Sequence, residues 1–113
     1  MQTQNAQINI ESQTIQKEQV LQQLERDVIN AWNNYQNALY ILEAEAKNRS
    51  INELNFQRTE EQLKIGQITS VEFRQAQLNL LNAATNYNTA KYTAKVLEMQ
   101  LMQLSGQLLE MSF

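Results

Sequence analysis

Apolar residues recur every seven positions along the second half of the chain, from Phe73 to Leu108. One series consists of Phe73, Leu80, Tyr87, Ala94, Leu101 and Leu108, and a second, three residues further on, of Ala76, Ala83, Ala90, Leu97 and Leu104. Alternating steps of three and four residues place both series on one face of an α-helix and are typical of the a and d positions of a coiled coil. The pattern predicts a helix over about residues 70–110.

The first half of the chain carries a matching a-type series, in which Arg49 is the one charged exception. Its members are Leu21, Val28, Tyr35, Leu42, Arg49, Phe56 and Leu63. The chain has no proline and only two glycines, Gly66 and Gly106, so no helix breaker interrupts residues 6–65. We therefore predict a first helix over about residues 6–65. Trp32 flanks its apolar stripe, and we interpret it as a packed core residue rather than a ligand-stacking one.

Signals for a helix end and a new helix start coincide at residues 66–69, which we predict to be a turn. Gly66 suits the C′ position of the first helix, where the backbone adopts a positive φ. Thr69 suits the N-cap of the second helix, with Glu72 completing a capping box and Ile68 and Phe73 placed as a hydrophobic staple. Because so short a connection forces antiparallel neighbours, the predicted fold is all-α. It is a long antiparallel two-helix coiled-coil hairpin formed by residues 1–113 and belonging to an oligomeric bundle or α-barrel.

The turn also predicts which residues face each other across the hairpin. Phe56 should lie near Leu80, and Arg49 near Tyr87. The hairpin seam should include Phe56, Leu63, Phe73, Leu80, Tyr87, Leu97, Leu101 and Leu104. Near the turn the facing layers are small or polar, with Glu45, Asn52 and Thr59 at core positions of the first helix. Since fewer apolar atoms are buried there, we predict weaker association of the helices in that half.

Two surfaces have no predicted partner within the chain. The second helix has an additional apolar stripe nearly opposite its seam, formed by Val71, Leu78, Leu81, Tyr92, Met99 and Met102. The first ~25 residues extend beyond the second helix, because that helix is shorter. Such residues either fray or pack on another copy or on a further part of a longer protein, and the stripe is either a second seam or ordinary surface apolarity. We predict self-association.

Composition argues against catalysis. The chain has no histidine and no cysteine, which removes the commonest bases, nucleophiles and metal ligands. Neighbouring acids such as Glu60 and Glu61 point apart on a helix and are explained by a solvated face. A net charge of −3 without a basic patch argues against nucleic acid. We expect no enzyme activity, no cofactor, no metal and no nucleic-acid partner.

The turn and the start of the second helix resemble a known family. The stretch from Gly66 to Gln77, Gly-Gln-Ile-Thr-Ser-Val-Glu-Phe-Arg-Gln-Ala-Gln, followed by Leu80 and Ala83, resembles the tip and returning helix of TolC-like outer-membrane efflux proteins. Leu101, Leu104, Ser105 and Gly106 resemble the end of that helix. Residues 28–65 are similar to the incoming helix and residues 70–106 to the outgoing one.

The resemblance implies a periplasmic coiled-coil segment of an outer-membrane channel for efflux, multidrug export or type I secretion. Family members are trimers whose helices form a periplasmic tunnel wall. Their tips dock a periplasmic adaptor protein that is linked to an inner-membrane pump. The docking tip would be Ile65, Gly66, Gln67, Ile68, Thr69, Ser70 and Val71.

The chain also departs from this family. It has no signal peptide, no barrel strands and one hairpin where such proteins repeat two, so we expect an excised segment that is itself soluble. Some members latch the tip with an aromatic and a basic residue, where this chain has Leu63 and Ile68. The alternative is a stand-alone helical hairpin that acts as an adaptor or chaperone-like interaction module.

Overall fold

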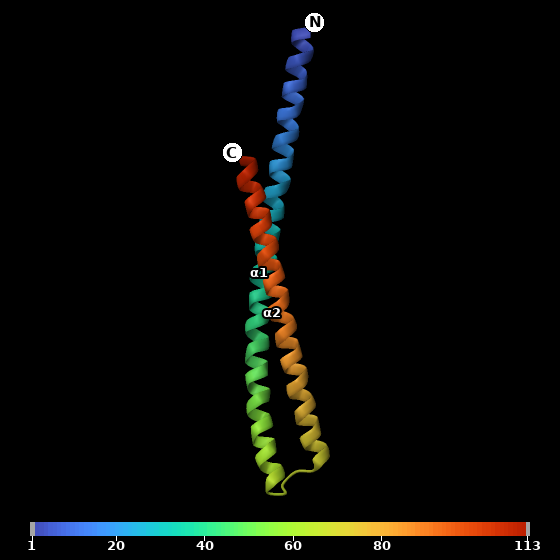
Figure 1. Ribbon diagram of the computed structural model, residues 1–113, viewed down its shortest axis with the longest axis vertical. Helices are drawn as coiled ribbons and strands as arrows, with labels where there is room; N and C mark the ends of the chain where they lie inside the picture. Colours follow the sequence, from blue (N-terminus) through green and yellow to red (C-terminus); the bar gives the residue numbers. More distant parts are fainter. Residues whose placement is uncertain (1, 113) are drawn as a thin grey trace.

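The computed structural model describes residues 2–112 and shows one helical hairpin. Helix α1 (Gln2–Lys64) and helix α2 (Ser70–Ser112) lie side by side and antiparallel, forming a rod of 95 × 20 × 14 Å (Figure 1). The predicted all-α coiled-coil hairpin is confirmed. Residues 1 and 113, which the predicted hairpin included, lie outside the described part.

Helix α1 is longer at its outer end than the sequence predicted, whereas α2 agrees with the predicted range of about 70–110. Helix α1 begins at Gln2 rather than near residue 6. Helix α2 continues through Ser105 and Gly106, where the resemblance placed a helix end, to Ser112. A glycine inside a helix costs only about 1 kcal/mol relative to alanine. The apolar contacts of seam residues on both sides of Gly106 offset this cost, so α2 does not end there.

The turn between the helices is closed by backbone hydrogen bonds. Gly66 has a φ of 78°, and no other described residue has a positive φ. The Gln67 amide donates to the Gln62 carbonyl at 2.9 Å and the Gly66 amide to the Leu63 carbonyl at 3.1 Å. These two bonds define a Schellman motif, which satisfies carbonyls that the helix end leaves unpaired. The positive φ predicted at Gly66 is therefore observed.

The two glycines should respond in opposite ways to the same substitution. Gly66→Ala should lower the free energy of unfolding by about 1 kcal/mol, because alanine is strained at a positive φ. Gly106→Ala should raise it by about 0.5–1 kcal/mol, because alanine is the better helix former. An added Cβ meets no atom within 4 Å at either position, so backbone conformation alone decides both signs. Urea unfolding followed by circular dichroism measures both values, and equal signs would contradict this account of the turn.

The core between the helices consists mainly of alanine. The buried residues are Leu24, Ala31, Ala38, Thr59, Ala76, Ala83, Ala90 and Ala94. Ala83 is the most buried of them, at 2% exposed. All eight occupy a or d positions of the heptad pattern, with larger a and d residues half-buried around them. Small side chains allow two helices to approach closely, so α1 and α2 pack through a narrow seam.

Two contacts fix how residues of α1 and α2 are matched across the seam. The Arg49 guanidinium carbon lies 5.0 Å from the centre of the Tyr87 ring, as the predicted register requires. Phe56 lies against Phe73 with 5.5 Å between ring centres, about two turns nearer the tip than the predicted neighbour Leu80. Thr59 and Ala76 lie between these layers and are small, which leaves room for both rings to lean toward each other.

The interpretation of Trp32 as a core residue is wrong. Its side chain is 51% exposed, whereas Ala31 beside it is buried. Trp32 follows an a position by four residues and therefore lies at the flank of the seam, where α2 does not cover it. A large apolar side chain thus remains open to a further partner.

Candidate functional site

The tip presents apolar side chains on a backbone that its hydrogen bonds hold in place. Ile65 is 68% exposed and Val71 is 78% exposed, and they flank the turn on its two sides. Gln67, Thr69 and Ser70 are exposed and polar, and Ile68 is half-buried. The tip thereby combines two isoleucines and a valine with hydroxyl and amide groups, a composition suited to contact with another protein.

The start of α2 is capped by Thr69. Its hydroxyl oxygen accepts a hydrogen bond from the Glu72 amide at 3.2 Å, and its carbonyl accepts one from the Phe73 amide at 3.1 Å. Within residues 2–112 no hydrogen bond joins the Glu72 carboxylate to the Thr69 amide, so only one half of the predicted capping box is formed. The N-cap bond is sufficient to satisfy one free amide of the first turn.

The residues predicted for the hairpin seam all lie between the two helices as half-buried side chains. They are Phe56, Leu63, Phe73, Leu80, Tyr87, Leu97, Leu101 and Leu104. The alanines that form the buried centre, and Leu24 near the outer end, were absent from that set. Leu24 lies three residues after Leu21 and seven before Ala31, so the heptad spacing contained the signal for it.

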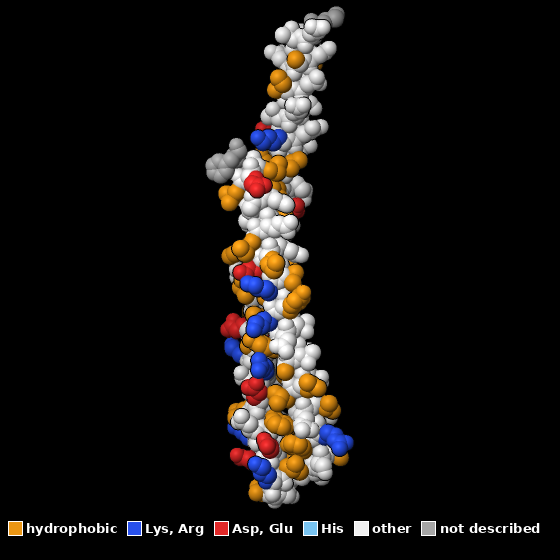
Figure 2. All heavy atoms as spheres, viewed as in Figure 1, with side chains coloured by type: hydrophobic (Ala, Val, Ile, Leu, Met, Phe, Trp, Pro, Cys, Tyr) orange, Lys and Arg blue, Asp and Glu red, His pale blue; other side chains and the backbone are white. Residues whose placement is uncertain are grey.

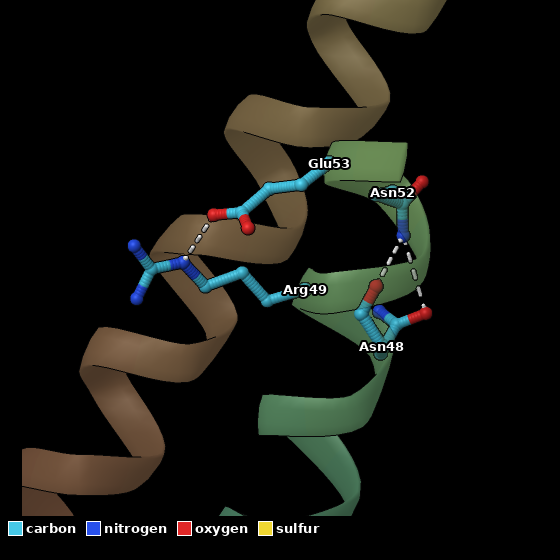
Figure 3. Close-up of polar contacts among 4 residues, drawn as sticks. All are labelled: Asn48, Arg49, Asn52 and Glu53. Carbon is cyan, nitrogen blue, oxygen red and sulfur yellow. Dashed lines mark hydrogen bonds and ion pairs between the residues drawn. The ribbon is translucent and has the colours of Figure 1, made fainter. Parts of the chain in front are cut away.

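A polar cluster on α1 occupies the seam in the half nearest the tip (Figure 3). The Arg49 Nε donates to Glu53 Oε1 at 3.1 Å, and the Asn52 side-chain amide donates to the Asn48 carbonyl at 2.8 Å and to Asn48 Oδ1 at 3.3 Å. All these bonds stay within α1. The polar side chains at these a and d positions therefore add no hydrogen bond between the helices.

Glu45 continues this polar section of the seam. Its Oε2 atom is buried and has no hydrogen-bond partner. A desolvated polar atom without a partner costs roughly 1–3 kcal/mol. No ion pair in the described part of the chain joins α1 to α2, because the three present connect residues three or four apart on one helix. The helices are thus held together by apolar contacts and by the stacking of Arg49 on Tyr87.

Large apolar side chains also lie on the outside of the rod. The predicted second stripe of α2 is exposed throughout, at Val71, Leu78, Leu81, Tyr92, Met99 and Met102. On the face drawn in Figure 2, hydrophobic side chains are spread along most of the rod, with single charged side chains of both signs between them. The hairpin by itself leaves this apolar surface in contact with water.

The described residues contain no arrangement typical of a metal centre or a membrane span. No group of three or more histidine, cysteine, aspartate or glutamate side chains converges between residues 2 and 112. Neither described helix has a stretch long and apolar enough to cross a bilayer. The tip and the exposed apolar faces are therefore the features that call for a functional explanation.

Comparison with known proteins adds no relative. No protein-family model, no curated protein and no solved structure matches the chain.

Proposed function

We propose that the hairpin is a periplasmic coiled-coil segment of a TolC-like outer-membrane channel for efflux or secretion. It would form part of the tunnel wall and dock a periplasmic adaptor protein at its tip, with an inner-membrane pump beyond the adaptor. The observation that carries the proposal is the tip itself, in which exposed Ile65 and Val71 flank a turn closed by the Schellman bonds at Gly66.

Two further features support a place in a larger helical wall. A helix that carries apolar residues on opposite sides is suited to two neighbours, and α2 has both the seam and the exposed outer stripe. The polar section of the seam, from Glu45 to Asn52 of α1, faces Ala83 and Ala90 of α2 in the half of the hairpin nearer the tip. Polar side chains at core positions of α1 suit a segment whose helices separate when a channel opens. In such a channel the chain would be one part of a trimer.

Tip docking can be tested with purified periplasmic adaptor proteins from several tripartite pumps, using biolayer interferometry. The chain should bind at least one adaptor, and Ile65→Asp/Val71→Asp should weaken that binding about tenfold or more, because apolar anchors at the centre of an interface dominate affinity. The matched control is Ile41→Asp/Ile51→Asp, which changes two exposed isoleucines outside the tip. Absence of binding to every adaptor, or equal loss in control and tip variants, would contradict the proposal.

A second hairpin with the same heptad pattern, encoded in the same reading frame, would separate a channel segment from a stand-alone interaction module. The channel proposal requires such a repeat, whereas a module that acts alone does not.

A further inference from the structure

The first part of α1 extends past the end of α2 and touches no other element (Figure 1). Because Arg49 stacks on Tyr87, the end of α2 lies level with about residue 24 of α1. Every residue from Gln2 to Val20 is exposed. This free segment, residues 2–20, forms nearly one third of α1 and has no partner in the hairpin.

One face of the free segment alternates isoleucine with glutamate. Ile8, Glu11, Ile15 and Glu18 follow one another at steps of three and four residues and therefore lie along one side of the helix. Ile8 is 61% exposed and Ile15 is 54% exposed. Neither glutamate forms an ion pair with any residue that the structure describes.

The same helix face continues toward the middle of the hairpin. Ile29 occupies the same heptad position (b) as Ile8 and Ile15, and Trp32 the same position (e) as Glu11 and Glu18. Both Ile29 and Trp32 are more than half exposed. Leu39, a further seven residues on, lines a groove between α1 and α2. The free segment and this groove are thus two ends of one continuous surface.

The groove has an apolar floor and a rim that carries two lysines and one glutamate, Glu98. Tyr35, Leu39 and Leu42 of α1 line it together with Tyr92 of α2. Lys91 and Lys95 also line it, one helical turn apart on α2. Lys95 pairs with Glu98 at 3.5 Å, whereas Lys91 forms no ion pair among residues 2–112, so the rim keeps a net positive charge of one. The groove therefore matches, in charge and in apolar character, the face that carries Glu11, Ile15 and Glu18.

We propose that the free segment of one chain lies in this groove of a second copy, and the reverse, in an antiparallel dimer. A chain cannot fill its own groove, because its free segment continues a straight helix away from it. If Glu18 is level with the partner's Lys95, Glu11 lies within about one turn of the partner's Lys91, and Ile15 lies beside the partner's Tyr92.

This alignment produces a symmetric assembly. The two-fold axis passes near Ile29 and Trp32, so these exposed side chains meet their own copies. Each chain contributes one face of its free segment and its groove, and the symmetry makes both contacts twice. The two tips project at opposite ends of the dimer and remain accessible, whereas a tunnel wall needs every tip at one end. The dimer is therefore an assembly of the chain on its own, separate from the tunnel wall and independent of the proposed function.

Charge reversal tests the pairing directly, with sedimentation velocity to give the mass and dissociation constant. The wild-type chain should be a dimer at micromolar concentration. Glu11→Lys/Glu18→Lys should raise its dissociation constant about tenfold or more through like-charge repulsion. Adding Lys91→Glu/Lys95→Glu to that variant should restore the constant to within about threefold of wild type, because the pairs are re-formed with exchanged signs. The control variant Ile65→Asp/Val71→Asp should dimerise as the wild type does.

The single tryptophan gives an independent measurement. Trp32 lies near the proposed two-fold axis, so its emission should shift to the red on dilution as the dimer dissociates and water reaches the ring. A monomer at all concentrations up to millimolar, a trimer, or charge reversal without loss or without rescue would overturn the proposal. Failure of adaptor binding would leave these measurements unchanged, so the two proposals can fail separately.

Discussion

The double variant Glu45→Leu/Asn52→Leu should have a free energy of unfolding about 2–4 kcal/mol above that of the wild type. Both residues occupy d positions in the polar section of the seam, facing the α2 alanines. Leucine would bury apolar surface at each position, and the change at Glu45 also removes a buried carboxylate oxygen that has no hydrogen-bond partner. Asn52 bonds only to Asn48 on its own helix, so no contact between helices is lost.

Urea unfolding at one fixed chain concentration, followed by circular dichroism, measures this gain. The matched control is Glu60→Leu/Asn55→Leu, which makes the same two replacements at exposed positions of α1. The control should change the free energy of unfolding by about 0.5 kcal/mol at most from loss of the surface polar groups. Leucine is also a better helix former than asparagine, which adds a small gain in the control and in the seam variant alike. An equal gain in both variants would show that helix propensity, and not the seam, is responsible. The polar seam would then not be a weak section of the hairpin.

The second prediction concerns the most buried residue of the seam. Ala83→Phe should lower the free energy of unfolding by about 3 kcal/mol, because a large side chain inserted into a packed seam forces the helices apart. Ala83 is the most buried residue of the described chain, at 2% exposed. The control Asn82→Phe places the same side chain on the exposed neighbour and should change stability by about 0.5 kcal/mol or less.

The same denaturant titration, with both variants at equal concentration, measures this difference. Retention of wild-type stability by Ala83→Phe would mean that the seam is loose enough to accept a phenyl ring. The proposed role of alanine in setting the spacing of the helices would then be wrong.

Local rules in the sequence predicted the turn because each of its signals acts over a few residues. A glycine at C′ and a threonine at the N-cap determine their own backbone hydrogen bonds, and both are found at Gly66 and Thr69. The heptad spacing likewise predicted that Arg49 lies near Tyr87, since the turn length fixes the register, and the structure shows the guanidinium over the ring. The function of the tip stays a prediction, because exposure alone does not identify a partner.

Side-chain placement at the edges of the seam was less predictable. Heptad position indicates which residues face the partner helix, but not how far a large side chain leans along it. Phe56 and Phe73 therefore meet across the small pair Thr59 and Ala76, and Trp32 points to water although it adjoins the stripe. The heptad pattern did predict that α2 runs through Gly106, and there it outweighed the helix end that the family resemblance implied.

The sequence by itself determined two long helices, one reversal at Gly66 and the residues of the seam, because helix periodicity and capping are local properties of the chain. The tertiary structure alone decided which atoms are desolvated and which surfaces stay open. It placed the Glu45 carboxylate oxygen in the seam without a partner, and it left the glutamate face of residues 2–20 and the lysine-rimmed groove both exposed. These properties depend on where the second helix ends and how closely it approaches, which residues distant in the chain decide together.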